Sequence, residues 1–242
     1  MDQSQEKQQS ILAHLSALRN VLVVSAIAVF AAFIVIFYAA IDPLMHLITQ
    51  PIVDRGIEVI YTAMSEALMT KLKVALIAAV VAASPVIFWQ IWKFIKPALY
   101  PHEKKAFRLI FFVAVALFLT GVVFCYGAVY MLAVDFFLVS GQDLASPMLS
   151  IDKYVSFLFG FVLPFGVAFE LPVALYITTK MGLTNYQMLA SKRKYVILGI
   201  VVIAAILTPP DVVSQVMLAI PVLVLFEVGL LITRMVKPKE RE

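Results

Sequence analysis

Glu103 is the one acidic residue in a basic stretch of the chain. Residues 97–108 read PALYPHEKKAFR and separate two long apolar runs. The bases around this carboxylate are Lys93, Lys96, Lys104, Lys105 and Arg108. A carboxylate accepts paired hydrogen bonds from a guanidinium in a geometry that lysine cannot imitate. The stretch is therefore either a basic membrane anchor with a weak local salt bridge at Glu103, or a site at which Glu103 selects a cationic ligand.

Glu170 is the second candidate, because it lies inside the apolar run 154–179. An ionisable residue within a membrane span costs at least about 2.5–3.5 kcal/mol, and by default it indicates function. Pro164 and Pro172 interrupt backbone hydrogen bonding on either side of it. They predict a bent helix that lines a water-filled cavity.

The neighbours of this carboxylate leave two interpretations open. Gly166 and Ala174 lie one turn away on either side, so this helix face permits close approach of a ligand or of another backbone. The alternative is a structural contact with a polar residue of a neighbouring helix, such as Gln90 or Gln215.

Three other polar residues have structural explanations. Asp211 follows two prolines and precedes an apolar run, so it is predicted to cap the N-terminus of a helix. Arg19 is typical of an interfacial anchor. Glu227, in the last apolar run, is interpreted as structural or close to the interface.

The composition excludes a soluble protein. The 242 residues are 63% hydrophobic and only 14% charged, against about a quarter charged in a soluble domain. The single cysteine, Cys125, cannot form a disulfide or a thiolate metal site within one chain. The sequence contains no HExxH, GxSxG or P-loop motif. We therefore expect one integral membrane domain that is not an enzyme and binds no cofactor, metal or nucleic acid.

The apolar runs predict an all-α membrane protein with six transmembrane helices. The predicted spans are 21–41, 74–95, 109–134, 154–179, 195–207 and 212–232. The fifth is short, because about 13 residues of helix rise only about 20 Å against a hydrocarbon core of about 30 Å. Residues 1–20 are predicted to form an amphipathic lead-in, and residues 42–73 and 135–152 to form external caps.

The distribution of basic residues predicts the orientation. Fifteen of the 19 Lys and Arg residues lie in alternate segments, which are the two ends of the chain, residues 93–108 and residues 180–194. By the positive-inside rule these segments are cytoplasmic. Both termini and Glu103 are then on the cytoplasmic side, which requires an even number of spans.

Four stretches of sequence point to one family. They are HLSALR near the N-terminus, ASPVIFWQIWKFI followed by PALYPHEKKAF, FGVAFELPV around Glu170, and LTPPDVVSQVMLAIPVLVLFEVG near the C-terminus. Together these motifs closely resemble the TatC family, the polytopic subunit of the twin-arginine protein translocase. The resemblance extends from His14 to Arg234.

This resemblance implies a fold and a function. TatC-like proteins have six helices in a concave cup, with the last two helices short and both termini in the cytoplasm of a bacterium or archaeon. They are core receptor subunits that bind the twin-arginine signal peptides of folded proteins. They assemble with single-span TatA/TatB-type subunits, as homo-oligomers in a larger complex within the lipid bilayer. Export is driven by proton-motive force.

The resemblance also implies roles for residues on the cytoplasmic face. Glu103 is the expected arginine-binding carboxylate, and Arg19, Pro97, Leu99 and Tyr100 are expected to support it.

Other roles follow within the membrane and at its external side. Glu170 is expected in the cup, at a position that the family links to later transport steps, with Gln90 as a second intramembrane polar residue. Asp211 and Gln215, at the external turn beside the fifth helix, are expected to dock the single-span partners.

One position departs from the family pattern His-Leu-x-Glu-Leu-Arg. This chain has HLSALR, with Ala17 where the pattern has an acid that helps Glu103. Three explanations stay open: Glu6 or Asp2 substitutes, the affinity is lower, or the position was engineered.

A function of another class is the alternative. A secondary transporter would use Glu170 as an intramembrane proton or ion site. Such transporters usually show paired repeats with broken helices, and no internal repeat is visible in this sequence.

Overall fold

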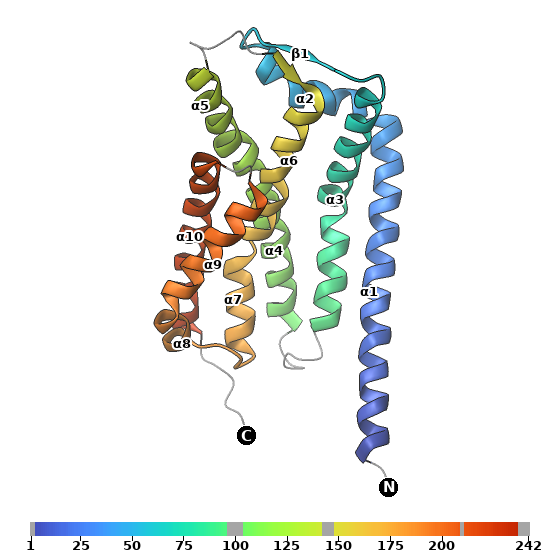
Figure 1. Ribbon diagram of the computed structural model, residues 1–242. Helices are drawn as coiled ribbons and strands as arrows, with labels where there is room; N and C mark the ends of the chain where they lie inside the picture. Colours follow the sequence, from blue (N-terminus) through green and yellow to red (C-terminus); the bar gives the residue numbers. More distant parts are fainter. Residues whose placement is uncertain (1–2, 96–103, 142–147, 209–210, 237–242) are drawn as a thin grey trace.

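The computed structural model describes residues 3–95, 104–141, 148–208 and 211–236. Its long helices run side by side, with α1 at one edge and α9 and α10 at the other (Figure 1). The elements in chain order are α1 (Gln3–Ala39), α2 (Ile41–Val53), β1 (Glu58–Ile60), α3 (Glu66–Ile95), α4 (Lys104–Phe124), the π-helical stretch η2 (Cys125–Tyr130), α5 (Met131–Gly141), β2 (Met148–Ser150), α6 (Ile151–Ala168), α7 (Leu171–Lys180), α8 (Tyr186–Ser191), α9 (Arg193–Leu207) and α10 (Val212–Met235).

Five helical segments of the described chain are long and apolar enough to cross a membrane. They are Leu15–Ala39, Glu66–Phe94, Arg108–Gly141, Ile151–Lys180 and Val212–Met235. The helix α9, with 15 residues, is shorter than all of these. The prediction of a helical, multi-pass membrane protein is confirmed. The sequence did not predict the two three-residue strands, which pair in parallel with Val59 opposite Leu149.

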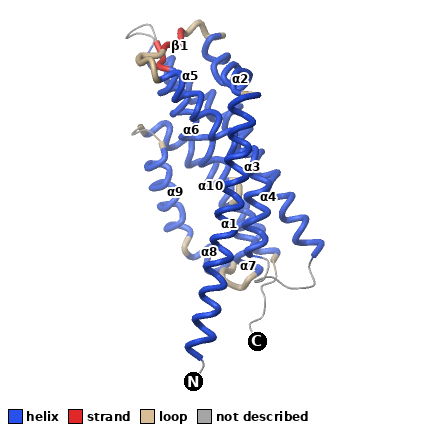
Figure 2. Tube along the Cα trace, turned by 90° about the vertical axis from the view of Figure 1, so that its right-hand side faces the viewer, coloured by secondary structure: helices blue, strands red, loops and turns tan. Residues whose placement is uncertain are grey.

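The two sides of the molecule differ. We call the side that carries α2, β1 and β2 the cap side; α5 ends there, and α3 and α6 begin there (Figures 1 and 2). On the opposite side α1 begins, and α7 and α10 end. The end of α9 and the start of α10 lie below the cap in both views, so these helices form a hairpin that does not reach it.

Two helices begin earlier than the apolar runs from which spans were predicted. The helix α1 is continuous from Gln3 to Ala39, so most of the predicted lead-in belongs to the same helix as the apolar run that follows. The helix α3 begins at Glu66, inside the segment 42–73 that was predicted as a cap. Polarity limits how much of a helix enters lipid, but it does not end the helix, and helical hydrogen bonding therefore continues past the apolar run.

The helix α6 lies at the centre of the bundle. It contacts α3, α4, η2, α9 and α10. Its buried side recurs at intervals of three and four residues, as expected for one face of a helix; the buried residues are Tyr154, Val155, Leu158, Phe161, Val162, Phe165 and Gly166. The position of α6 therefore determines how the other helices pack.

Pro51 leaves a carbonyl of α2 without its usual partner, because proline has no N–H to donate to the residue four positions earlier. That residue is Leu47, and the Tyr126 hydroxyl donates to its carbonyl at 2.6 Å. The Tyr154 hydroxyl donates to the next carbonyl, that of Ile48, at 2.7 Å. Two tyrosines of the bundle thus attach α2 to η2 and α6.

The helices α4 and α6 approach each other closely at two glycines. A Cβ added to Gly121 would lie 2.8 Å from the Phe165 carbonyl oxygen and 2.8 Å from the Phe169 ring. A Cβ added to Gly166 would lie 2.6 Å from the Phe118 ring. Each glycine thus receives an aromatic ring from the other side of the contact, and the spacing of the two helices depends on both.

Gly121→Ala is expected to destabilise the protein by about 1–3 kcal/mol, because a backbone carbonyl, which cannot rotate away, must move to admit the methyl group. The measurement is the thermal unfolding midpoint of the purified protein in detergent. Gly199→Ala on α9 is the matched control, since a Cβ there meets nothing within 4 Å. Equal midpoints for the two variants would contradict the close approach of α4 and α6.

Candidate functional site

The membrane-spanning segment that contains Glu170 is broken at that residue. The helix α6 ends at Ala168, and α7 begins at Leu171, with Glu170 immediately before it. Pro172, in the first turn of α7, has no N–H to donate to the Ala168 carbonyl, and its ring crowds that oxygen. Pro164 lies inside α6 without ending it. The predicted interruption of the helix is confirmed, and Pro172 accounts for it, while the water-filled cavity stays a prediction.

One oxygen of the Glu170 carboxylate is buried without a partner. In the part of the chain that the structure describes, Oε1 of this residue has no hydrogen-bond partner, neither Gln90 nor Gln215 included. The Gln215 side chain instead donates to the Val201 carbonyl at 3.0 Å, and Gln90 is half-buried on α3. Neither polar contact considered from the sequence therefore satisfies this oxygen.

Asp211 and Gln215 stabilise the turn between α9 and α10. The Asp211 carboxylate accepts a hydrogen bond of 2.6 Å from the Ser214 backbone N–H. The predicted N-cap is thus confirmed. Since Gln215 lies on α10 and Val201 on α9, the hydrogen bond between them joins the two helices of the hairpin.

A second contact joins this hairpin further from the turn. Arg193, the first residue of α9, donates from Nη2 to Glu227 Oε2 of α10 at 2.8 Å. The structural interpretation of Glu227 is thereby confirmed. The Arg234 guanidinium lies 5.9 Å from the centre of the Tyr186 ring, which adds a cation–π contact between α10 and α8.

Most of the predicted arginine-binding patch lies outside the described residues. This applies to Glu103, Pro97, Leu99 and Tyr100. Arg19 is described, and it is exposed on α1, as is Ala17. At the ends of α3 and α4 that flank residues 96–103, Lys93 and Arg108 are also exposed.

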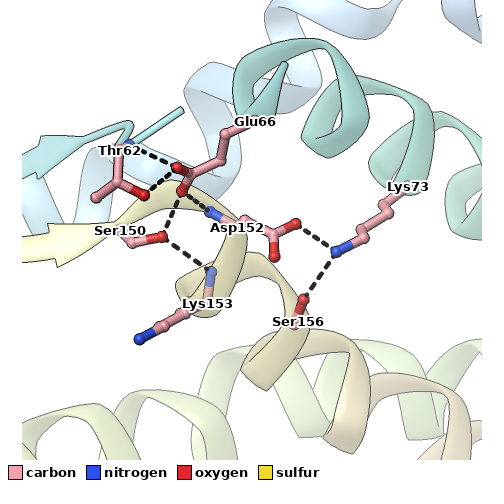
Figure 3. Close-up of polar contacts among 7 residues, drawn as sticks. All are labelled: Thr62, Glu66, Lys73, Ser150, Asp152, Lys153 and Ser156. Carbon is pink, nitrogen blue, oxygen red and sulfur yellow. Dashed lines mark hydrogen bonds and ion pairs between the residues drawn. The ribbon is translucent and has the colours of Figure 1, made fainter. Parts of the chain in front are cut away.

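The sequence analysis missed a polar cluster on the cap side. The Glu66 carboxylate accepts hydrogen bonds from the Thr62 backbone N–H and hydroxyl and from the Ser150 hydroxyl (Figure 3). Lys73, on the same helix, pairs with Asp152 of α6. The contacts of Glu66 with Ser150 and of Lys73 with Asp152 join segments roughly a third of the chain apart, so no local pattern signals them.

Two further ion pairs lie close to the cap. Arg55 Nε donates to Asp135 Oδ1 at 2.7 Å, and this hydrogen bond raises the pKa of the guanidinium above its ordinary value. Lys71 pairs with Asp42 at 2.8 Å. Together with Lys73, three basic side chains of this region are therefore neutralised by acids of the same chain.

The part of the chain that the structure describes offers no set of ligands for a metal ion. No group of three or more His, Cys, Asp or Glu side chains lies close enough to hold an ion among residues 3–95, 104–141, 148–208 and 211–236. The arrangement can offer a carboxylate at a helix break and basic residues on the side opposite the cap.

Comparison with known proteins identifies the family. The family model described as Sec-independent protein translocase protein (TatC) matches residues 13–221. The chain belongs to the TatC family. The TatC protein of Carboxydothermus hydrogenoformans is 41% identical over 98% of this chain and 97% of its own length. That of Aquifex aeolicus is 40% identical over 95% and 96%, respectively, and that of Escherichia coli K12 is 36% identical over 98% and 93%.

Solved structures agree with this TatC membership. A crystal structure described as the twin-arginine translocase receptor TatC superposes with a TM-score of 0.84 at 39% identity. The matched region covers 92% of this chain and 98% of the chain in that structure. A second, in DDM, gives a TM-score of 0.85 at 40% identity over 91% and 99%. The chain therefore has the TatC fold and is a transport protein rather than an enzyme. Membership of a protein translocase family argues against the alternative of a secondary transporter of small solutes.

Glu170→Gln is expected to leave the thermal unfolding midpoint in detergent unchanged or to raise it. A neutral amide costs less to bury than a carboxylate, and Oε1 of this carboxylate has no partner among the described residues. Glu227→Gln is the comparison, and it should lower the midpoint because it removes the partner of Arg193. A clear fall of the midpoint for Glu170→Gln would show that hydrogen bonds to the carboxylate outweigh the cost of burying it.

Proposed function

We propose that this chain is the receptor subunit of a twin-arginine translocase, and that Glu103 binds the arginine pair of a signal peptide. The observation that carries the proposal is TatC membership over nearly the whole chain. The solitary acid in residues 97–108 supports the choice of residue. Since the bases around it repel cations, binding there depends on one carboxylate, which favours selectivity over bulk attraction.

The remaining residues of the proposed patch are Arg19, Pro97, Leu99 and Tyr100. Arg19 is exposed on α1, and α1 begins on the side of the molecule where α3 ends (Figure 1). The start of α1 and the end of α3 are thus on one side, which supports a common binding surface.

We assign the side opposite the cap to the cytoplasm of a bacterial or archaeal cell. Fifteen of the 19 basic residues belong to the segments at this side. With α9 counted as a short fifth span, the chain crosses the membrane six times and both termini are cytoplasmic. The hairpin of α9 and α10 does not reach the cap, which supports the proposal of a concave cup that the resemblance to TatC implies.

The helix α9 supports the proposed docking of single-span TatA/TatB-type subunits. Ala204 is the buried residue of this helix, whereas Leu198 and Ile206 are 60% and 76% exposed. An apolar helix with so little contact within its own chain leaves surface for other spans. Because Asp211 and Gln215 have partners within the chain, we propose that they support docking by fixing α9 against α10.

Glu170 is proposed to act after binding, within the cup. The break between α6 and α7, together with the buried Oε1 that has no partner among the described residues, supports a role that is not purely structural. We also propose coupling to proton-motive force and assembly as a homo-oligomer in a larger complex, which the TatC resemblance implies.

A binding measurement decides the receptor role. A labelled twin-arginine signal peptide should bind the purified protein in detergent, and the same peptide with both arginines replaced by lysine should bind at least about tenfold more weakly, because lysine cannot form the bidentate pair. Glu103→Gln should remove this preference for arginine.

Two outcomes would argue against this role for the isolated chain. Equal binding of both peptides would indicate bulk electrostatic attraction or adsorption. Absence of binding would indicate that the site lacks either the acid that Ala17 replaces or the partner subunits. Binding regained by Ala17→Glu would identify the missing acid as the cause. Export of twin-arginine substrates by a stably inserted Glu103→Ala variant would contradict the assignment of Glu103.

A further inference from the structure

Glu66, the first residue of α3, contacts two loops that are far apart in sequence. Its Oε2 accepts from the Thr62 N–H at 2.5 Å, from the Thr62 hydroxyl at 2.8 Å and from the Ala63 N–H at 3.2 Å. Its Oε1 accepts from the Ser150 hydroxyl and from the Asp152 N–H, the latter at 3.3 Å. Five donors therefore converge on one carboxylate. Figure 3 shows those of Thr62, Ser150 and Asp152.

We infer that Glu66 is a positioning residue of the transport machinery, which fixes the start of α6 to the α2–α3 segment and makes the two cap segments one unit. The positioning rests on geometry alone. Its consequence for export rests on the proposed function.

The chemistry of the five donors requires a carboxylate. Three of them are backbone N–H groups, of Thr62, Ala63 and Asp152, which can only donate. A Gln at position 66 would turn an NH2 group toward one of these sets of donors, whereas an ionised carboxylate accepts on both oxygens. Hydrogen bonds to a charged acceptor are also about twice as strong as neutral ones.

Ser150 passes the constraint from Glu66 to α6. It is the N-cap of this helix, and its Oγ accepts from the Lys153 N–H. A hydroxyl has one hydrogen, and in Ser150 that hydrogen is donated to Glu66. The carboxylate thus sets the orientation of the group that caps α6.

A second contact joins the same two helices further along. Lys73 lies seven residues after Glu66 and therefore on the same face of α3. Its Nζ donates to the Asp152 carboxylate and, at 3.3 Å, to the Ser156 hydroxyl. Both acceptors lie on α6, one turn apart. The helices α3 and α6 are thus joined at two levels on the cap side.

The strands alone would hold the two segments weakly. They pair over three residues, from Glu58 with Met148 to Ile60 with Ser150, and an isolated two-stranded sheet is marginally stable at best. Since Ser150 both ends β2 and contacts Glu66, the carboxylate stabilises the point at which the sheet passes into α6.

Hydrogen–deuterium exchange of the full chain in detergent measures the positioning without reference to export. Glu66→Gln should raise the exchange of amides in residues 58–63 and 148–153 together, by at least about tenfold at Asp152, which loses a charge-assisted bond. Glu58→Gln is the matched control, because Glu58 is an exposed acid of the same cap, and it should leave both segments unchanged. Ser150→Ala tests the same joint from α6 and should raise exchange in residues 148–153.

Export assays with a covalent replacement test the consequence. Glu58→Cys and Met148→Cys place thiols on paired residues of the two strands, in a Cys125→Ala background that leaves these as the only cysteines. Glu66→Gln should reduce export of a twin-arginine substrate, and oxidation of the cysteine pair should restore both export and slow exchange.

Each contrary result has a distinct meaning. The inference would be overturned if Glu66→Gln raised exchange only in residues 58–63 and Ser150→Ala had no effect on exchange. Glu66 would then cap only its own helix. If oxidation of the cysteine pair restored slow exchange but not export, Glu66 would act on export directly rather than by positioning the cap segments. Failure of the unmodified protein to export any twin-arginine substrate would refute the proposed function and leave the exchange result standing.

Discussion

The fold depends on one constraint, which is that backbone groups inside a membrane cannot rely on water for hydrogen bonds. Continuous helices meet the constraint, and each interruption needs a specific substitute. The same need arises at Pro51 in the cap, outside the five spans, where the Tyr126 hydroxyl donates to the Leu47 carbonyl. At the α6–α7 break a tightened turn continues the pairing, since the Glu170 N–H donates to the Val167 carbonyl at 3.0 Å. The break is thus tolerated, and it is the place where the structure leaves a carboxylate oxygen without a partner among the described residues.

Electrostatics divide the two sides of the molecule by a related argument. Close to the cap, Arg55, Lys71 and Lys73 each pair with an acid of the same chain, so little positive charge remains for other groups. On the opposite side, Lys93 and Arg108 are exposed. The difference in positive charge between the two sides is therefore larger in the structure than in the count of basic residues. The reason is that the basic residues close to the cap, which are the minority, are mostly paired with acids.

Local chemistry explains what could be predicted from sequence. The Asp211 cap follows from Pro-Pro-Asp before an apolar run, and the break at Glu170 follows from Pro172, because in both cases cause and effect lie within four residues. Glu66 could not be found in this way, since its partner Ser150 is 84 residues away and each residue alone is ordinary for its position. The class of a helical, multi-pass membrane protein came from composition, whereas helix starts did not, because α3 continues into polar sequence. Glu103 stays a prediction, since it lies outside the described residues.

The helix α6 connects the features that matter for transport. Its 18 residues rise about 27 Å, so it reaches from the cap almost through the hydrocarbon core. Its start is held by Glu66, and near its end Gly166 admits the Phe118 ring of α4, so the two helices pack closely there. A displacement of α6 would therefore be transmitted along its length as a rigid body. The turn at Phe169 and Glu170 is where that rigidity ends, because α7 is a separate helix packed on α10. Glu170 thus lies between a part fixed to the cap and a part fixed to the α9–α10 hairpin, and relative motion of the two would change the surroundings of its carboxylate first.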